Sequence, residues 1–406
     1  MSDASTGSHR PELPRRVLML GTFAMHPKGT MSARAAGIAR ALADRGMDVR
    51  IATVPWDNPS EAGKRYEYNG VPVFNTRTIA PQLAPLAVRE LLTEAQSFQP
   101  DLVHLFKPKG FGDLAARVLR RRGVPVIVDM DDWEGDGGWN DRLPYSSIQR
   151  RLFQWQETSW PSMADGITAA SRTLQQYAHD LGASPDDVLY LPNQLGTERA
   201  HQLAHSTHTP NSPYPELLRP GRQRLLLYTR FVEFSADFIV EFLRLLVEQR
   251  PDVDLVIAGR SADGTAESAI RQVTTSMSLD QRLIWLDWID PQDLGWIARQ
   301  CRVAVVPFDD SLINRSKCSV KLLELLATGI PVVASSVGEN REYLYRHGGG
   351  ELARPGEPWA HVGRVIELLD AAEPILERSF DATMTWDEQA EVVERFYRSR
   401  SGASLA

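Results

Sequence analysis

Three absences narrow the classes of protein to which this chain can belong. Its 406 residues include only two cysteines, Cys301 and Cys318, which is too few for a disulfide framework and indicates a reducing compartment. No apolar run approaches the roughly 20 residues that cross a bilayer, and residues 1–14 lack the apolar stretch of a signal peptide. The net charge of −7 offers no basic surface for nucleic acid. We therefore expect a cytoplasmic protein with no transmembrane segment and no nucleic acid partner.

The remaining composition is that of an ordinary globular protein. Hydrophobic residues make up 43% of the chain and charged residues 24%, values that exclude a disordered or fibrous protein. A chain of 406 residues exceeds what one hydrophobic core usually serves. Composition and length together predict two domains of the size found in enzymes.

Strand and helix patterns alternate along both halves of the sequence. An apolar run at 17–20 ends at Gly21 and predicts a buried strand, residues 33–45 have apolar positions at helical spacing, and 49–54 form a second apolar run. This order is typical of the βαβ unit of a parallel sheet. The periodicity disappears between 196 and 223, where His, Ser, Thr and Pro dominate, and a second series of strands and helices follows.

We predict an α/β protein with two Rossmann-like domains, each a doubly wound parallel sheet, facing each other across a cleft. Ligands of such sheets bind beyond the carboxyl ends of the strands, so the loops after strands should carry the chemistry. The predicted segments are a flexible tail at 1–14, an N-terminal domain at 15–195, a linker at 196–223, a C-terminal domain at 224–380, and a helical segment at 381–406 that packs back on the N-terminal domain.

The segment 316–338, SKCSVKLLELLATGIPVVASSVG, is the most informative stretch. A loop of small polar and basic residues enters a helix on which Lys321 and Glu324 lie one turn apart. The N-terminus of a helix suits a diphosphate, because its free N–H groups and its dipole favour anions, and Lys317 and Lys321 would add charge. Glu324 would accept hydrogen bonds from ribose hydroxyls. The alternative is that Lys321 and Glu324 form only an i, i+3 surface pair.

This segment resembles the donor-site helix of family-four glycosyltransferases, which share the two-Rossmann GT-B fold. Further motifs resemble that family in the same order along the chain. They are PNQLG at 192–196, LLYTRF at 226–231, VDLVIAGR at 253–260, LIWLDWI at 283–289 and LLELLATGIPVVAS at 322–335. In the first half, Gly29 and the helix that follows resemble the acceptor-side glycine loop of the family.

The resemblance implies a metal-independent, retaining hexosyltransferase with no cofactor, which moves a sugar from a nucleotide diphosphate donor to a small-molecule or glycan acceptor. It implies that Arg230 holds the diphosphate with help from Lys321 and Lys317, and that Glu324 holds the ribose. Arg230 and Lys321 are implied to have a catalytic role as well as a binding role. The strand ends at Gly259, Trp288 and Ile289 are implied to contact the donor.

Two positions depart from the family pattern. The family commonly has a sugar-contacting glutamate where this chain has Ser316, and a phosphate-binding lysine where it has Ser235. We expect Lys317 or Lys321 to replace the missing charge, because cations need only surround the diphosphate. Ser316 stays a donor-site candidate by position.

The acidic loop DMDDWEGDG at 129–137 is a second candidate site. A D-x-D after a strand suggests a metal-bound nucleotide sugar, and the bland alternative is a polar loop. We favour Asp131 or Asp132 as a catalytic, acceptor-side residue without metal. His104, within a predicted strand, is either a core histidine or a second catalytic candidate. Gly29 and Lys28 complete the acceptor-side prediction.

Two alternative functions and the role of one helix stay open at this point. The same fold serves nucleotide-sugar epimerases, and the departures at Ser316 and Ser235 would suit a non-catalytic partner subunit. The helix at 150–163 mixes arginine with Phe and Trp, a composition that fits a membrane-surface face, an acceptor-binding face or a core helix. The oligomeric state has no signature in the sequence.

Overall fold

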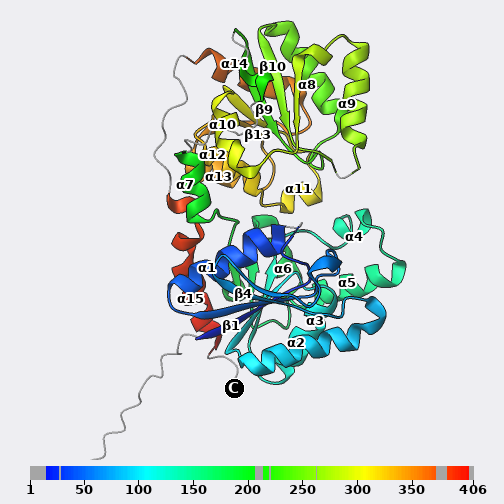
Figure 1. The fold of residues 1–406 in the computed structure, drawn as a ribbon, viewed down its shortest axis with the longest axis vertical. Coiled ribbons are helices and arrows are strands. Elements are labelled where there is room, and N and C mark those ends of the chain that lie inside the picture. The colour runs from blue at the N-terminus through cyan, green and yellow to red at the C-terminus, as the bar shows by residue number, and fades with distance from the viewer. Residues whose placement is uncertain are drawn as a thin grey trace, which may run out of the picture. The chain divides into compact units, whose positions relative to one another are not determined.

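A computed structural model of the chain describes residues 15–26, 29–205, 214–218, 221–261, 263–371 and 382–401. The chain divides into two compact units, shown in Figure 1. Unit 1 comprises Met1–Pro192 with Trp386–Ala406, and unit 2 comprises Asn193–Thr385. Each unit is an α/β domain built on one sheet.

Unit 1 contains an eight-stranded sheet in the order β3-β4-β2-β1-β5-β6-β7-β8. Its strands are β1 (Arg16–Gly21), β2 (Asp48–Thr53), β3 (Arg65–Tyr68), β4 (Val71–Asn75), β5 (Leu102–Phe106), β6 (Val126–Met130), β7 (Gly166–Ala169) and β8 (Val188–Tyr190). Its helices are α1 (Ala36–Asp44), extended at its start by a π-helical turn (Thr30–Ala35), α2 (Ala84–Phe98), α3 (Gly110–Arg121), α4 (Trp139–Arg142), α5 (Ser147–Ser159), α6 (Arg172–Asp180) and α15 (Trp386–Ser401).

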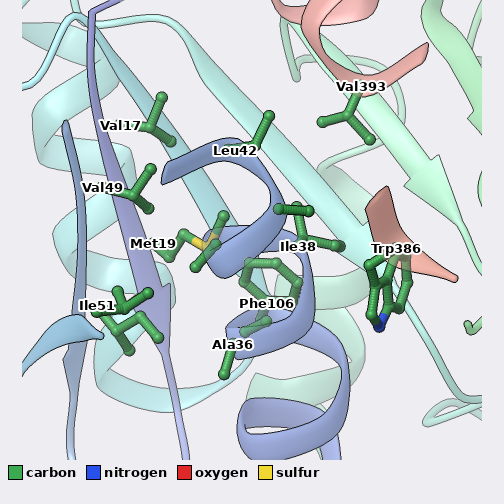
Figure 2. Close-up of a cluster of buried hydrophobic side chains, with 14 of the residues drawn as sticks. Val17, Met19, Ala36, Ile38, Leu42, Val49, Ile51, Phe106, Trp386 and Val393 are labelled. Atoms are coloured by element: carbon green, nitrogen blue, oxygen red, sulfur yellow. The ribbon is translucent and has the colours of Figure 1, made fainter. Parts of the chain in front are cut away.

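One buried hydrophobic cluster of unit 1 lies where α1 packs on the central strands (Figure 2), and another includes Leu18 and Leu20 of β1 and Leu91 of α2. Ile38 and Leu42 of α1 belong to the same buried cluster as Val17 and Met19 of β1. Trp386, the first residue of α15, joins this cluster and donates a hydrogen bond from Nε1 to the carbonyl of Ala33 (3.2 Å). A side chain at position 37 would collide with the Trp386 ring, because a Cβ built on Gly37 lies 2.3 Å from it. The small residue therefore lets the last helix pack against the first.

Unit 2 contains a six-stranded sheet, parallel throughout, in the order β11-β10-β9-β12-β13-β14. Its strands are β9 (Gln223–Tyr228), β10 (Val253–Ala258), β11 (Leu283–Asp287), β12 (Val303–Val306), β13 (Val332–Ser335) and β14 (Gly350–Ala353). Its helices are α7 (Thr197–Ala204), α8 (Ala236–Gln249), α9 (Thr265–Ser276), α10 (Leu294–Arg299), α11 (Leu312–Ser316), α12 (Val320–Ala327), α13 (Glu339–His347) and α14 (Pro358–Asp370).

The structure differs from the sequence prediction at the edge of the first sheet. Strand β3 pairs antiparallel with β4, whereas a wholly parallel sheet was expected. The two strands are joined by Asn69-Gly70, both with positive φ (50° and 75°). Asn-Gly in this conformation forms the tight turn of a β-hairpin, which imposes an antiparallel return.

The predicted linker at 196–223 also contains more structure than expected. It includes helix α7, which buries Ala200 and Leu203, and a single helical turn at Pro215–Leu218. Eight residues are too few for a clear helical period in the sequence, so packing rather than pattern specifies this helix. The predicted tail at 1–14 and residues 206–213 and 219–220 lie outside the described residues.

Candidate functional site

The loop after β9 and the start of α12 bring the predicted basic residues of unit 2 together. Arg230 follows β9 and is exposed, and its guanidinium lies 5.5 Å from the ring centre of Trp288, which is itself 62% exposed. Burial lowers the pKa of Lys321, and the charge of Arg230 contributes to the same shift. Arg230, Lys317 and Lys321, together with the carboxylate of Glu233, are called the basic cluster below.

Glu233 organises the two lysines of the basic cluster. Its side chain is 2% exposed, and its Oε1 lies 2.7 Å from Nζ of Lys317 and 2.9 Å from Nζ of Lys321. The backbone N–H of Val232 donates to Oε2 (3.3 Å). Burial opposes ionisation of Glu233, but the charges of Lys321 and Lys317 outweigh it and hold the pKa of Glu233 well below its ordinary value. Glu233 is therefore a fixed anion that holds both ammonium groups in place.

The basic cluster carries an excess of positive charge. Three cations against one carboxylate leave a formal charge of +2. Burial lowers the pKa of Lys321, and the neighbouring charges of Lys317 and Arg230 lower it further, whereas Glu233 raises it. Crowded cations of this kind gain most from a bound anion, because it relieves their mutual repulsion. The arrangement can bind a group with two or more negative charges.

Glu324 and Lys321 are not paired with each other, which excludes the i, i+3 surface pair considered from the sequence. Oε1 of Glu324 instead accepts hydrogen bonds from Nε (2.9 Å) and Nη2 (2.7 Å) of Arg199, on α7. Arg199 is fixed in turn by a bond from Nη1 to the carbonyl of Pro291 (2.8 Å). The hydroxyl of Tyr228 lies beside the same carboxylate; burial raises the pKa of Tyr228 first and the charge of Glu324 raises it further.

The other predicted donor-site residues have clear structural roles. Gly259 has a φ of 131°, and a Cβ there would lie 1.8 Å from the carbonyl oxygen of Thr229, so only glycine lets the end of β10 approach the loop after β9. Ile289 is 5% exposed, within the core beside the exposed Trp288. Ser316 is fully buried and donates to the carbonyl of Ile313 (2.9 Å) at the end of α11.

Ser235, the position of the expected phosphate-binding lysine, begins α8. Its hydroxyl accepts a hydrogen bond from the backbone N–H of Phe238 (3.3 Å), which is an N-cap. The two lysines paired with Glu233 are at 317 and 321 instead. Positive charge absent from position 235 is therefore supplied by Lys317, just before α12, and Lys321, in its first turn.

In unit 1, the acidic loop after β6 meets two lysines from the end of β5. Nζ of Lys107 lies 2.7 Å from Asp132 Oδ2 and 2.9 Å from Glu134 Oε1. Nζ of Lys109 lies 2.8 Å from the other oxygen of Glu134. Burial opposes the charge on Glu134, yet Lys107 and Lys109 hold its pKa at about 2. The carboxylates of Asp132 and Glu134 are thus neutralised by ammonium groups.

Asp131 lies deeper in the same loop and is 9% exposed. Its Oδ2 accepts a hydrogen bond from the hydroxyl of Thr30 (2.7 Å), and its Oδ1 lies 3.6 Å from Nζ of Lys107. Burial raises the pKa of Asp131 to about 7, Lys107 opposes the rise, and the charges of Asp132 and Asp129 add to it. Burial therefore holds the pKa of Asp131 above the ordinary range of an aspartate.

His104 lies inside β5 with a fully buried side chain. One ring nitrogen bonds the hydroxyl of Tyr397 on α15 (2.7 Å) and the other bonds the hydroxyl of Thr168 (3.0 Å). Burial lowers the pKa of His104 to about 4, against the pull of Asp129. A neutral ring with both nitrogens bonded inside the protein fits the core histidine considered from the sequence rather than a catalyst.

The predicted acceptor-side glycine, Gly29, is exposed and has an ordinary φ of −72°. A Cβ there meets only Ala33, at 3.9 Å, so the backbone does not require glycine at this position. Lys28 lies outside the described residues. Within the described ranges, no group of three or more His, Cys, Asp or Glu side chains has an arrangement that would hold a metal ion.

Glu157 of α5 is a buried acid next to this loop, at a cavity of about 10 Å³, roughly the space of one water molecule. Burial raises its pKa to about 8, and the charge of Glu134 adds to the rise. The unfolded chain ionises at a lower pH than the folded one, so ionisation favours unfolding as pH rises from about 4.5 to about 8.

We predict that Glu157→Gln removes this loss of stability. At pH 8 the variant should be more stable than the wild type by an amount on the order of 2–4 kcal/mol, whereas the difference should vanish near pH 4. Urea unfolding across this pH range measures the effect, with the exposed Glu388→Gln as the matched control. Parallel pH profiles for Glu157→Gln and the wild type would contradict the prediction.

Sequence reasoning missed Glu233 and Arg199, the two residues that hold the predicted ones in place. Glu233 stands three residues after Arg230, and no spacing in the sequence connects it with lysines at 317 and 321. Arg199 falls in the segment that was predicted to be a linker. Only the folded chain brings either residue to its partner.

Family models match both units of the chain. The model described as a glycosyl transferase 4-like domain matches residues 29–194, and the model of the glycosyl transferases group 1 matches residues 222–371. No curated protein matches the sequence at a significant level. Within the described residues, no helix has both the length and the apolar character that spanning a bilayer requires.

Solved structures resemble the whole chain at low sequence identity. Sucrose-phosphate synthase from Thermosynechococcus elongatus has a TM-score of 0.64 at 16% identity, over 96% of this chain and 95% of its own. Anabaena HepE in complex with UDP has a TM-score of 0.62 at 17% identity, over 95% of this chain and 97% of its own. The catalytic domain of starch synthase IV from Arabidopsis thaliana, bound to ADP and acarbose, has 0.69 at 11%, over 96% and 100%. With both units matched by family models and the fold shared along the full length, the chain belongs to the group 1 glycosyltransferases of the GT-B fold.

Proposed function

We propose that the chain transfers a sugar from a nucleoside diphosphate donor, with the diphosphate bound at the basic cluster and the ribose at Glu324. The observation that carries this proposal is the clamp of Lys317 and Lys321 on the buried Glu233, because it fixes two ammonium groups near Arg230 and leaves the cluster at +2. A structurally similar protein, Anabaena HepE, is known in complex with UDP-glucose.

In the proposed reaction the bond between the anomeric carbon and the diphosphate oxygen breaks, and a bond to the acceptor oxygen forms on the same face of the sugar. The acceptor hydroxyl loses its proton to the departing diphosphate, so charge and atoms balance. Arg230 and Lys321 stabilise the negative charge that grows on the leaving phosphate. The retained configuration and the absence of a metal in this scheme follow the family resemblance and are part of the proposal.

Thermal melting with a panel of UDP, GDP, ADP and dTDP, each with its matching sugar donor, tests the proposal. A ligand at 100 times its Kd stabilises the folded state by about 2.7 kcal/mol, so the correct nucleotide should stand out by its raised Tm. Release of that nucleoside diphosphate in the presence of candidate acceptors then measures transfer. Failure of every nucleotide to raise the Tm would overturn the proposal. Binding without turnover would favour the non-catalytic subunit, and a new sugar epimer without acceptor would favour the epimerase.

The Arg199–Glu324 pair leads to a prediction about nucleotide selectivity. Both donated bonds go to Oε1 of Glu324, and the fork of Arg199 thereby sets the orientation of the carboxylate. We expect Arg199→Met to weaken binding of the ribonucleoside diphosphate about tenfold, the usual worth of one or two bonds to a charged group. Binding of the 2′,3′-dideoxy analogue should stay within about twofold, because it has no diol for Glu324 to accept from.

Isothermal titration with the two nucleotides measures this difference. Arg222→Met is the matched control, because Arg222 forms a comparable pair with Asp254 in the same unit (2.8 Å). If Arg199→Met weakened both nucleotides equally, Arg199 would hold the fold of the site rather than orient Glu324. An unchanged affinity for the ribonucleotide would remove Arg199 from the site.

A further inference from the structure

Helix α5 of unit 1 has an apolar stripe that faces solvent. Ile148, Leu152 and Trp155 are 81%, 40% and 50% exposed. They stand at i, i+4 and i+7, so at 3.6 residues per turn they lie on one side of the helix. Single exposed apolar residues are common, but three aligned on one helix mark a surface that contacts something apolar.

The opposite side of α5 supplies most of its packing, and of the stripe only Trp155 contacts α3, where the guanidinium of Arg117 lies 4.2 Å from its ring centre. Gln156 is fully buried, and its Nε2 donates to Asp113 of α3 (2.8 Å). Ser159 accepts a hydrogen bond from Arg117 of α3 (2.7 Å). Trp160, just after the helix, is fully buried in the core of unit 1. These contacts attach the inner side of α5, which is labelled in Figure 1, to the rest of unit 1.

The charges beside the stripe are basic. Arg151 is exposed between Ile148 and Leu152, and Arg142, shortly before the helix, is exposed as well. Arg150 is exposed and lies 3.8 Å from Asp141. The one carboxylate on α5 itself, Glu157, is buried on the inner side. The exposed side of α5 is therefore apolar and cationic, although the whole chain has a net charge of −7.

We propose that Ile148, Arg151, Leu152 and Trp155 of α5, together with Arg142 at the end of α4, dock onto an anionic lipid bilayer. The helix has 13 residues and is about 20 Å long, a length that lies in the interface plane rather than spanning it. Apolar side chains would enter the boundary of the acyl region, and the arginines would meet lipid phosphates. The acidic remainder of the chain would be repelled, so the charge pattern orients unit 1 with α5 toward the surface. This proposal does not depend on the donor site.

Sedimentation of the full chain with vesicles tests the proposal. The protein should sediment with vesicles of phosphatidylcholine mixed with phosphatidylglycerol, and far less of it should sediment with vesicles of phosphatidylcholine alone. Added salt should release the bound protein. Arg142→Gln and Arg151→Gln should each weaken binding about fivefold, from the usual worth of one basic residue near an anionic surface. Ile148→Ser with Leu152→Ser should weaken it by at least as much.

Tyr345→Ser in unit 2 is the matched control, because Tyr345 is a 93% exposed aromatic on a different helix, α13, and its loss should leave vesicle binding unchanged. The Tm of each variant and its response to the bound nucleotide separate a docking defect from misfolding and from failure of the donor site. The proposal is overturned by wild-type protein that ignores anionic vesicles at low salt, or by α5 variants that bind them as the wild type does. If the apolar face of α5 bound a protein instead of lipid, the wild-type chain would not bind anionic vesicles.

Discussion

Arg230→Ala should lower the turnover of sugar transfer by about 10²-fold or more, if the growing charge on the leaving phosphate is desolvated. Arg230 is exposed and stands beside Trp288, and its charge reaches Lys321 in the basic cluster. Its loss would leave two lysines, both already bonded to Glu233, to stabilise the leaving group. Steady-state kinetics with the donor identified by melting measure the effect.

Two controls make this prediction sharp. Arg364→Ala removes an exposed arginine from α14, where Arg364 pairs with Glu367 (2.7 Å), and should leave turnover unchanged. Because Arg230 is a surface residue, its removal should change stability by no more than about 0.5 kcal/mol. Wild-type turnover in Arg230→Ala would remove Arg230 from the mechanism. A large fall in Tm would instead attribute the loss to the fold.

Arg34→Met should destabilise unit 1 by about 3–5 kcal/mol, the usual cost of breaking a buried ion pair from one side. Nε and Nη2 of Arg34 each lie 2.7 Å from one oxygen of Asp129, and the two side chains are 2% and 0% exposed. Asp129 also accepts a hydrogen bond from Thr168 (2.5 Å). Without Arg34 the carboxylate would stay buried with no cation in contact with it. Urea unfolding measures the loss.

The matched control is Arg40→Met, on the same helical segment, since the pair of Arg40 with Asp44 is about half exposed on both sides. Such a pair contributes at most about 1 kcal/mol. The double variant Arg34→Met with Asp129→Leu should recover much of the stability, because the uncompensated charge disappears with its partner. A loss for Arg34→Met no larger than that for Arg40→Met would show that the buried pair contributes little.

Much of the fold was predictable because hydrophobic periodicity records which face of each element is buried. The βαβ start of unit 1, the second strand and helix series and the final helix are present in the structure with small shifts of their ends. The antiparallel pairing of β3 is specified locally by the Asn69-Gly70 turn, and this Asn-Gly pair could have been recognised in the sequence as a hairpin signal. Helix α7 lacked such a signal, because eight residues stabilised by neighbours leave little pattern.

The candidate site likewise has residues that the sequence predicted and residues that it did not. Lys321 and Glu324 were found through their position on a helix that follows a polar loop, which is a local feature. Their actual partners, Glu233 and Arg199, lie 88 and 125 residues away in the chain. Burial shifts the pKa values of two other candidate residues. It keeps His104 neutral in the core and raises the pKa of Asp131 to about 7.

The sequence by itself determined the two-domain α/β class, the family and the residue types of the proposed diphosphate site, because these depend on periodicity, short motifs and local chemistry. Only the tertiary structure decided which of those residues act together. It paired both lysines with a buried glutamate, turned Glu324 toward Arg199 rather than toward Lys321, and left one side of α5 uncovered. Long-range contacts and burial set the charges of side chains and their partners, and neither has a fixed spacing in the sequence.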